Sequence, residues 1–125
     1  MENLEYKINE VAWKIVEKIK EDKKKYKNEI DKALGVLTNN GVYAYWVYCK
    51  SKGIEKVFIE EVRELMKYTS VNLKDENGKN KNEEYEKYFR ELSKSLKDLL
   101  FFKEILEKTL ILVRYHAKAL EDGDE

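Results

Sequence analysis

The sequence predicts a compact single domain of the all-α class, with about six helices. The 125 residues include no proline and five glycines, and these are the two residue types that most often interrupt a helix. Apolar residues recur at intervals of three and four along most of the chain, which is the period of one helix face. With 42% hydrophobic residues, the chain has enough apolar material for a core of its own. We therefore expect one helical domain over residues 1–120.

The apolar period divides the domain into six helices. The first four are expected at residues 2–22, 24–38, 42–52 and 54–68. A fifth begins near Tyr85, and a sixth reaches about Leu120; they either meet at residues 99–102, with Asp98 as the cap, or form one bent helix. The segment 42–52 is rich in aromatic and β-branched residues and could form a strand, but one isolated strand cannot build a sheet. A helix is therefore expected there too.

Caps and polar segments set the boundaries. Asn3 is a good residue to begin the first helix, and Gly41 and Gly53 are good residues to end the second and third. The polar residues 69–82 lack the apolar period, so they predict a surface loop. The acidic residues 121–125 predict a disordered tail. The expected core consists of Ile15, Leu34, Leu37, Phe58, Val62, Leu92, Leu96, Leu106, Leu110 and Val113.

Charge and cysteine content narrow the class of protein. The chain carries 25 basic and 25 acidic side chains, and four of the acids lie in the segment 121–125, so the rest of the chain is mildly basic. A single cysteine rules out an intramolecular disulfide. No apolar run approaches the roughly 18 residues of a membrane span, and the first residues lack the layout of a signal peptide. A soluble, cytoplasmic protein without membrane contact is expected.

Candidate catalytic residues are few. Cys49 and His116 are the only cysteine and the only histidine, and we interpret them as a small buried hydrophobe and a surface helix residue. One cysteine and one histidine do not make a zinc site. The sequence therefore predicts no nucleophilic centre and no cofactor.

A cluster of glutamates offers an alternative that involves metal. Glu60, Glu61 and Glu64 fall within one turn of the predicted helix over 54–68, so they could ligate Mg²⁺. Their spacing resembles the EExxE element of MazG-like nucleotide pyrophosphohydrolases. Those enzymes need a second acidic pair, and the available one, Glu104 with Glu107, ends in Glu rather than Asp. In a chain with so many acids, three on one solvated face are ordinary, so we expect no metal site and no enzyme.

Basic residues suggest a different role. Four lysines, Lys23, Lys24, Lys25 and Lys27, fall at the corner between the first two predicted helices, and others flank the aromatic segment 42–52. Lysines spread over one surface could follow a phosphate backbone. Lysine runs in a lysine-rich protein are also commonly just solvated surface, so the pattern alone does not decide between the two.

Three segments resemble a known family. Residues 32–42, KALGVLTNNGV, run on to YCKSKG at 48–53, and together they form a helix with an Asn-Gly end followed by a short helix closing in Lys-Ser-Lys-Gly. Residues 107–120, EKTLILVRYHAKAL, place a Thr and a leucine-rich turn before an aromatic and basic segment. This combination resembles the small subunit of the type III-B (Cmr) CRISPR effector complex. Where family members often have Trp and Lys-Arg, this chain has Val113-Arg114 and His116.

The resemblance implies a subunit without catalytic activity. It implies an all-α protein that stacks with copies of itself and with other Cmr subunits, and that helps to hold target RNA paired to guide RNA in antiviral defence. The small subunit of type III-A complexes and a pure protein-interaction module are the alternatives. The expected RNA-contacting residues are Lys50, Lys52, Arg114 and Lys118, followed by Lys23, Lys24, Lys25 and Lys27.

Overall fold

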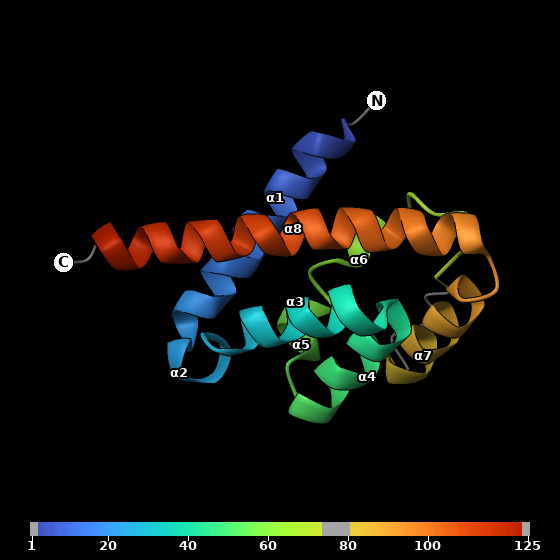
Figure 1. The fold of residues 1–125 in the computed structure, drawn as a ribbon, viewed down its shortest axis with the longest axis horizontal. Helices are drawn as coiled ribbons and strands as arrows, with labels where there is room; N and C mark the ends of the chain where they lie inside the picture. Colours follow the sequence, from blue (N-terminus) through green and yellow to red (C-terminus); the bar gives the residue numbers. More distant parts are fainter. Residues whose placement is uncertain (1–2, 74–80, 124–125) are drawn as a thin grey trace.

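The computed structural model describes residues 3–73 and 81–123, and every regular element within these ranges is a helix. The helices are α1 (Leu4–Glu21), α2 (Lys23–Tyr26), α3 (Glu29–Asn40), α4 (Val42–Lys52), α5 (Glu55–Phe58), α6 (Arg63–Met66), α7 (Lys81–Leu92) and α8 (Leu96–Gly123). The prediction of a compact all-α bundle is confirmed (Figure 1). No helix in the described ranges is both long enough and apolar enough to cross a bilayer.

The long helix α8 organises the molecule. It runs the length of the bundle and crosses α1, while α3 packs alongside it and α4 packs on α3 (Figure 1). The short helix α2 lies near the C-terminal end of α8, and α7 lies at the opposite end (Figure 1). Trp46 of α4, Phe89 of α7 and Phe102 of α8 are all fully buried, which places an aromatic cluster where these three helices meet.

The predicted helix boundaries are confirmed where a cap defines them. The side chain of Asn3 accepts a hydrogen bond from the Glu5 backbone N–H at 2.9 Å, as an N-cap does. Gly41 follows α3 with φ +94°, and Gly53 follows α4 with φ +66°. Both values lie in the region that favours glycine. Helix α4 spans the predicted residues, Val42–Lys52.

Two predicted helices are each divided in the structure. The predicted helix over 24–38 is split into α2 and α3 by a turn at Lys27 and Asn28, and Asp22 caps the start of α2 by accepting from the Lys25 N–H at 3.3 Å. The predicted helix over 54–68 is split into α5 and α6 by turns at residues 59–62. There the Phe58 carbonyl accepts a hydrogen bond from the Tyr45 hydroxyl at 2.7 Å. That tertiary bond occupies a carbonyl that a continuing helix would use.

The break before the last helix falls earlier than predicted. Helix α7 ends at Leu92 and α8 begins at Leu96, so the predicted junction at residues 99–102 is wrong. The Ser95 hydroxyl accepts from the Asp98 N–H at 3.4 Å, so the serine side chain, not the aspartate, faces the N–H groups of the first turn. Because of this shift, Leu96 is 69% exposed, and its assignment to the core is also wrong.

The remaining predictions concern the core, the polar loop and the acidic tail. Eight of the ten predicted core residues are buried, and Leu34 packs partly buried against them. The predicted loop at 69–82 is shorter, because α7 begins at Lys81 and Thr69 is buried, donating to the Met66 carbonyl at 2.8 Å. Residues 74–80 of this loop lie outside the described ranges. Helix α8 continues through residues 121–123 of the predicted disordered tail, and residues 124–125 lie outside the described ranges.

Candidate nucleic-acid interface

The first turn of α3 connects three parts of the chain. Its Glu29 carboxylate accepts a hydrogen bond from the Tyr48 hydroxyl of α4 at 2.6 Å. Two residues later, Asp31 forms an ion pair with Arg114 of α8, with 3.0 Å between Oδ1 and Nε. The end of α4 and the C-terminal part of α8 are therefore held against the start of α3, next to α2.

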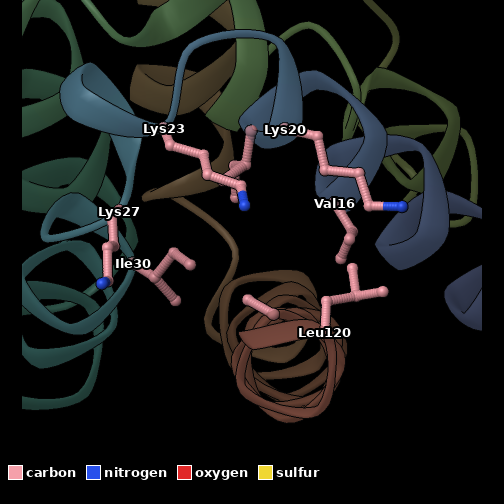
Figure 2. A pocket seen from close by; sticks show the side chains of 8 residues that line it. Val16, Lys20, Lys23, Lys27, Ile30 and Leu120 are labelled. Carbon is pink, nitrogen blue, oxygen red and sulfur yellow. The ribbon is translucent and has the colours of Figure 1, made fainter. Parts of the chain in front are cut away.

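A cleft opens between α1, α2, α3 and α8 at this end. Its volume is about 370 Å³. The cleft is lined by Val16, Ile19, Lys20, Lys23, Lys27, Ile30, Ala117 and Leu120. Figure 2 shows the Lys23 ammonium directed over the middle of the cleft, Lys27 at the edge beside Ile30, and Lys20 pointing outward. The cleft thus combines an aliphatic floor with a cationic rim.

Seven of the eight predicted RNA-contacting residues lie around this end of the molecule. Two of them, Lys23 and Lys27, line the cleft itself. The others occupy neighbouring positions on α2, on the end of α4 and on the C-terminal part of α8: Lys24, Lys25, Lys52, Arg114 and Lys118, all exposed. We call these seven residues together with Lys20 the basic end. They come from four helices, and the tertiary fold brings them together.

Lys52 joins the basic end through an aromatic contact. Its ammonium lies 5.9 Å from the ring centroid of Tyr48, whose hydroxyl is bonded to Glu29. This is a favourable cation–π geometry. The ammonium is therefore held close to the start of α3 and remains exposed to solvent.

Lys50 lies on a different face from Lys52. Its ammonium is 5.8 Å from the ring centroid of Trp46, and it borders a hollow of about 530 Å³ shared with α7. Three of the seven residues that line this hollow are Glu83, Glu86 and Glu91. Side chains two positions apart on a helix do not share a face. The structure therefore places Lys50 outside the basic end, beside a hollow lined partly by glutamates.

Acidic groups moderate the charge of the basic end. The Arg114–Asp31 pair has side chains 60% and 66% exposed, and ion pairs this exposed contribute only about 0–1 kcal/mol. The guanidinium can therefore leave Asp31 for a phosphate at little energetic cost.

Three residues beside the cleft were not predicted as part of an RNA-contacting surface, namely Lys20, Trp13 and His116. The Lys20 ammonium lies 5.5 Å from the ring centroid of Trp13, and Trp13 is 44% exposed. His116 meets the same indole edge-on, with ring centroids 5.6 Å apart and an interplanar angle of 82°. All three residues sit in helices whose apolar period indicated only packing. Their proximity depends on the crossing of α1 and α8, which the sequence does not show.

The glutamate cluster does not form the arrangement needed for metal binding. Glu60 and Glu61 lie in the turns that divide α5 from α6, and Glu64 lies on α6, so the three do not share one regular helix. Glu64 pairs with Lys7 at 3.7 Å and Lys14 at 3.5 Å, and Glu60 pairs with Lys81 at 3.6 Å. Across residues 3–73 and 81–123, no three His, Cys, Asp or Glu side chains are grouped to hold a metal ion.

Cys49 and His116 occupy different environments. Cys49 is fully buried in the core on α4, and burial raises the pKa of its thiol far above the ordinary value. A thiol in this state is a poor nucleophile. His116 is half-buried on α8, against Trp13. The interpretation of Cys49 as a small buried hydrophobe is confirmed.

Fold and surface together define a small all-helical protein with cationic side chains gathered at one end. The family model described as "CRISPR-associated protein (Cas_Cmr5)" matches residues 4–119. The chain belongs to this family, the small subunits of type III-B (Cmr) CRISPR complexes. Comparisons with curated proteins and with solved structures gave no match. The family match confirms the resemblance drawn from the three sequence segments and favours type III-B over the type III-A alternative.

Proposed function

We propose that this protein is a non-catalytic small subunit that supports guide and target RNA within the Cmr ribonucleoprotein. It stacks with copies of itself and with the other Cmr subunits, and its basic end contacts the sugar-phosphate backbone. In this role it contributes to antiviral defence in the cytoplasm. Family membership supports the place of the chain among Cmr subunits, and the surface chemistry supports the contact with RNA.

The observation that carries this proposal is the convergence of cations from separate helices. The chain as a whole has a formal net charge of zero, yet eight cationic residues from α1, α2, α4, α8 and the turn after α2 lie at one end. A surface of this kind attracts a polyanion by neutralising phosphates and releasing their counterions.

Phosphate contact suits a subunit that must accept any target sequence. Contacts to phosphates and sugars position a strand without reading its bases. Each subunit needs only weak contacts, because neighbouring copies in an assembly raise the effective concentration of the next site. The many lysines of the basic end fit this requirement, since an ammonium is a flexible point charge without fixed directionality.

The test is a salt titration of target-RNA binding by the assembled complex. Lys24, Lys52 and Lys118 are changed together to Ala, because all three are exposed and none lines the cleft. The matched control changes Lys87, Lys94 and Lys97 to Ala; these residues lie on α7, in the turn after it and at the start of α8, at the opposite end (Figure 1). Both variants lose the same charge.

The slope of log affinity against log salt should flatten by roughly 0.7–0.9 for each phosphate contact that is lost. The change should be the same for every guide sequence, and the control should keep the wild-type slope. An unchanged slope in the basic-end variant would contradict RNA contact, and the protein would then be a purely protein-interaction module that spaces other subunits.

A further inference from the structure

The cleft at the basic end has an aliphatic floor, which plays no part in contacts with phosphate. Its floor is formed by the aliphatic side chains of Val16, Ile19, Ile30, Ala117 and Leu120. Sites for small molecules occupy about 300–1,000 Å³ and are mostly apolar, with a few polar groups that fix orientation. At about 370 Å³, with lysines as its charged residues, the cleft matches this description.

The lysines of the rim and the aliphatic floor together suit a ligand that has an anionic part and an apolar part. The Lys23 ammonium lies over the middle of the cleft and Lys27 lies at its edge (Figure 2), which suits an anion held at the mouth. The aliphatic floor has no side-chain hydrogen-bonding group, so it suits a flat apolar face. Nucleotides combine these two parts, because their bases have apolar faces and their phosphates are anionic.

We infer that the cleft receives one unstacked nucleotide of the bound RNA strand, with the base over the aliphatic floor and its phosphate beside Lys23 and Lys27. This inference rests on the proposed function and deepens it. The edges of the base face the open mouth, where water satisfies them. The site therefore holds any base by its face and reads no sequence, as apolar and stacking contacts do.

Continuity with the rest of the basic end favours an RNA strand over an acidic peptide as the occupant. Lys24 and Lys25 continue the rim along α2, and Lys118 follows the floor residue Ala117 on α8. A strand that follows these cations passes the mouth of the cleft. At the same mouth, Lys20 lies over the half-exposed Trp13, which is backed by His116, and aromatic surfaces of this kind stack on bases.

The experiment compares two single strands that differ only in their bases. The full-length protein is titrated at low salt with a short oligouridylate and with an abasic strand of equal length. The test variant, Ala117→Leu, fills the floor with an aliphatic side chain and does not change the charge. The matched control, Ala119→Leu, adds the same side chain two residues further along α8, at an exposed position. Circular dichroism and thermal unfolding verify that both variants fold.

The wild type should bind the oligouridylate at least about fivefold more tightly than the abasic strand, the lower bound for one stacked base. Ala117→Leu should remove this preference, and Ala119→Leu should keep it. Equal affinity of the wild type for both strands, or no binding of oligouridylate, overturns the inference. If Ala117→Leu instead prevents the subunit from entering the complex, the cleft is a protein docking site and the inference falls. Whichever result the strand comparison gives, the proposed function is tested independently by the salt titration of the assembled complex.

Discussion

The indole Nε1 of Trp46 donates a hydrogen bond to Glu86 Oε2 at 2.6 Å. Trp46 is fully buried in α4, and Glu86 belongs to α7, so this bond ties α7 to the core. The Tyr43 hydroxyl donates to the other carboxylate oxygen of Glu86. These two bonds lower the pKa of Glu86 below its ordinary value, and the bond from Tyr43 has the larger effect.

The depressed pKa of Glu86 makes the stability of the protein depend on pH. A carboxylate whose pKa is lower in the folded state contributes stability above its unfolded pKa, and this contribution is lost as the pH falls through the folded pKa. With an ordinary value of 4.5, the loss occurs below that pH. Glu86→Gln should weaken this part of the acid dependence, measured by thermal unfolding over a pH series. Glu83→Gln, at an exposed position on the same helix, should unfold like the wild type throughout.

Leu96 and Leu110 form a matched pair for measuring how much a buried leucine of α8 stabilises the fold. Leu110 is fully buried and Leu96 is 69% exposed, both on α8. Leu110→Ala leaves a cavity and should lower the free energy of unfolding by about 2–5 kcal/mol. Leu96→Ala removes the same atoms from the surface and should change it by less than about 0.5 kcal/mol. Urea unfolding measures both, and similar losses in the two variants would mean that the assigned start of α8 is wrong.

Two glycines should respond to alanine with opposite signs. Neither Gly35 nor Gly53 has an atom within 4 Å of an added Cβ, so only the backbone decides. Gly53 has φ +66°, and Gly53→Ala should cost about 1–2 kcal/mol. Gly35 lies inside α3, and Gly35→Ala should stabilise by about 0.5–1 kcal/mol. Chemical denaturation of both variants compares the changes, and a stabilised Gly53→Ala would show that α4 does not end in a left-handed residue.

Glu61 provides a test of the metal alternative. Burial, the largest cause, raises the pKa of its carboxyl, and Lys18 and Lys14 oppose the shift. A raised pKa means that ionisation costs stability in the folded state, so Glu61→Gln should raise Tm at neutral pH, with a gain that fades as the pH falls. Mg²⁺ should leave Tm unchanged, and the pure protein should not hydrolyse nucleoside triphosphates. A rise in Tm with Mg²⁺ that Glu61→Gln abolishes would restore the metal site.

Local signals were sufficient to predict much of the fold. The caps at Asn3, Gly41 and Gly53 depend on side chains or backbone freedom within a few residues, and all three positions were predicted correctly. The division between α5 and α6 was not, because the Tyr45 hydroxyl that takes the Phe58 carbonyl comes from another helix. An apolar period also continues across a short turn such as Ser93–Ser95, since both flanking helices face the same core.

The candidate site was predictable only in part. The lysines of α2 and the cations of α8 were visible as separate groups, and the fold brings them to one end. Lys50 and Lys52 were named together because both match the Lys-Ser-Lys-Gly segment of the family, although side chains two positions apart on a helix point in different directions. The apolar floor of the cleft was not predicted, because residues that line a cleft and residues of the core follow the same helical period. The two kinds of residue are distinguished only by the way α1 crosses α8.

The length of α8 has a consequence for how the protein is made. This helix of 28 residues contributes the fully buried Phe102, Leu106, Leu110 and Val113 to the core, and both α1 and α3 pack against it. On the ribosome, the faces of α1 and α3 that pack on α8 stay uncovered until this segment has left the exit tunnel. Although α3 and α4 can pack on each other earlier, each newly made subunit completes its core only after α8 has emerged.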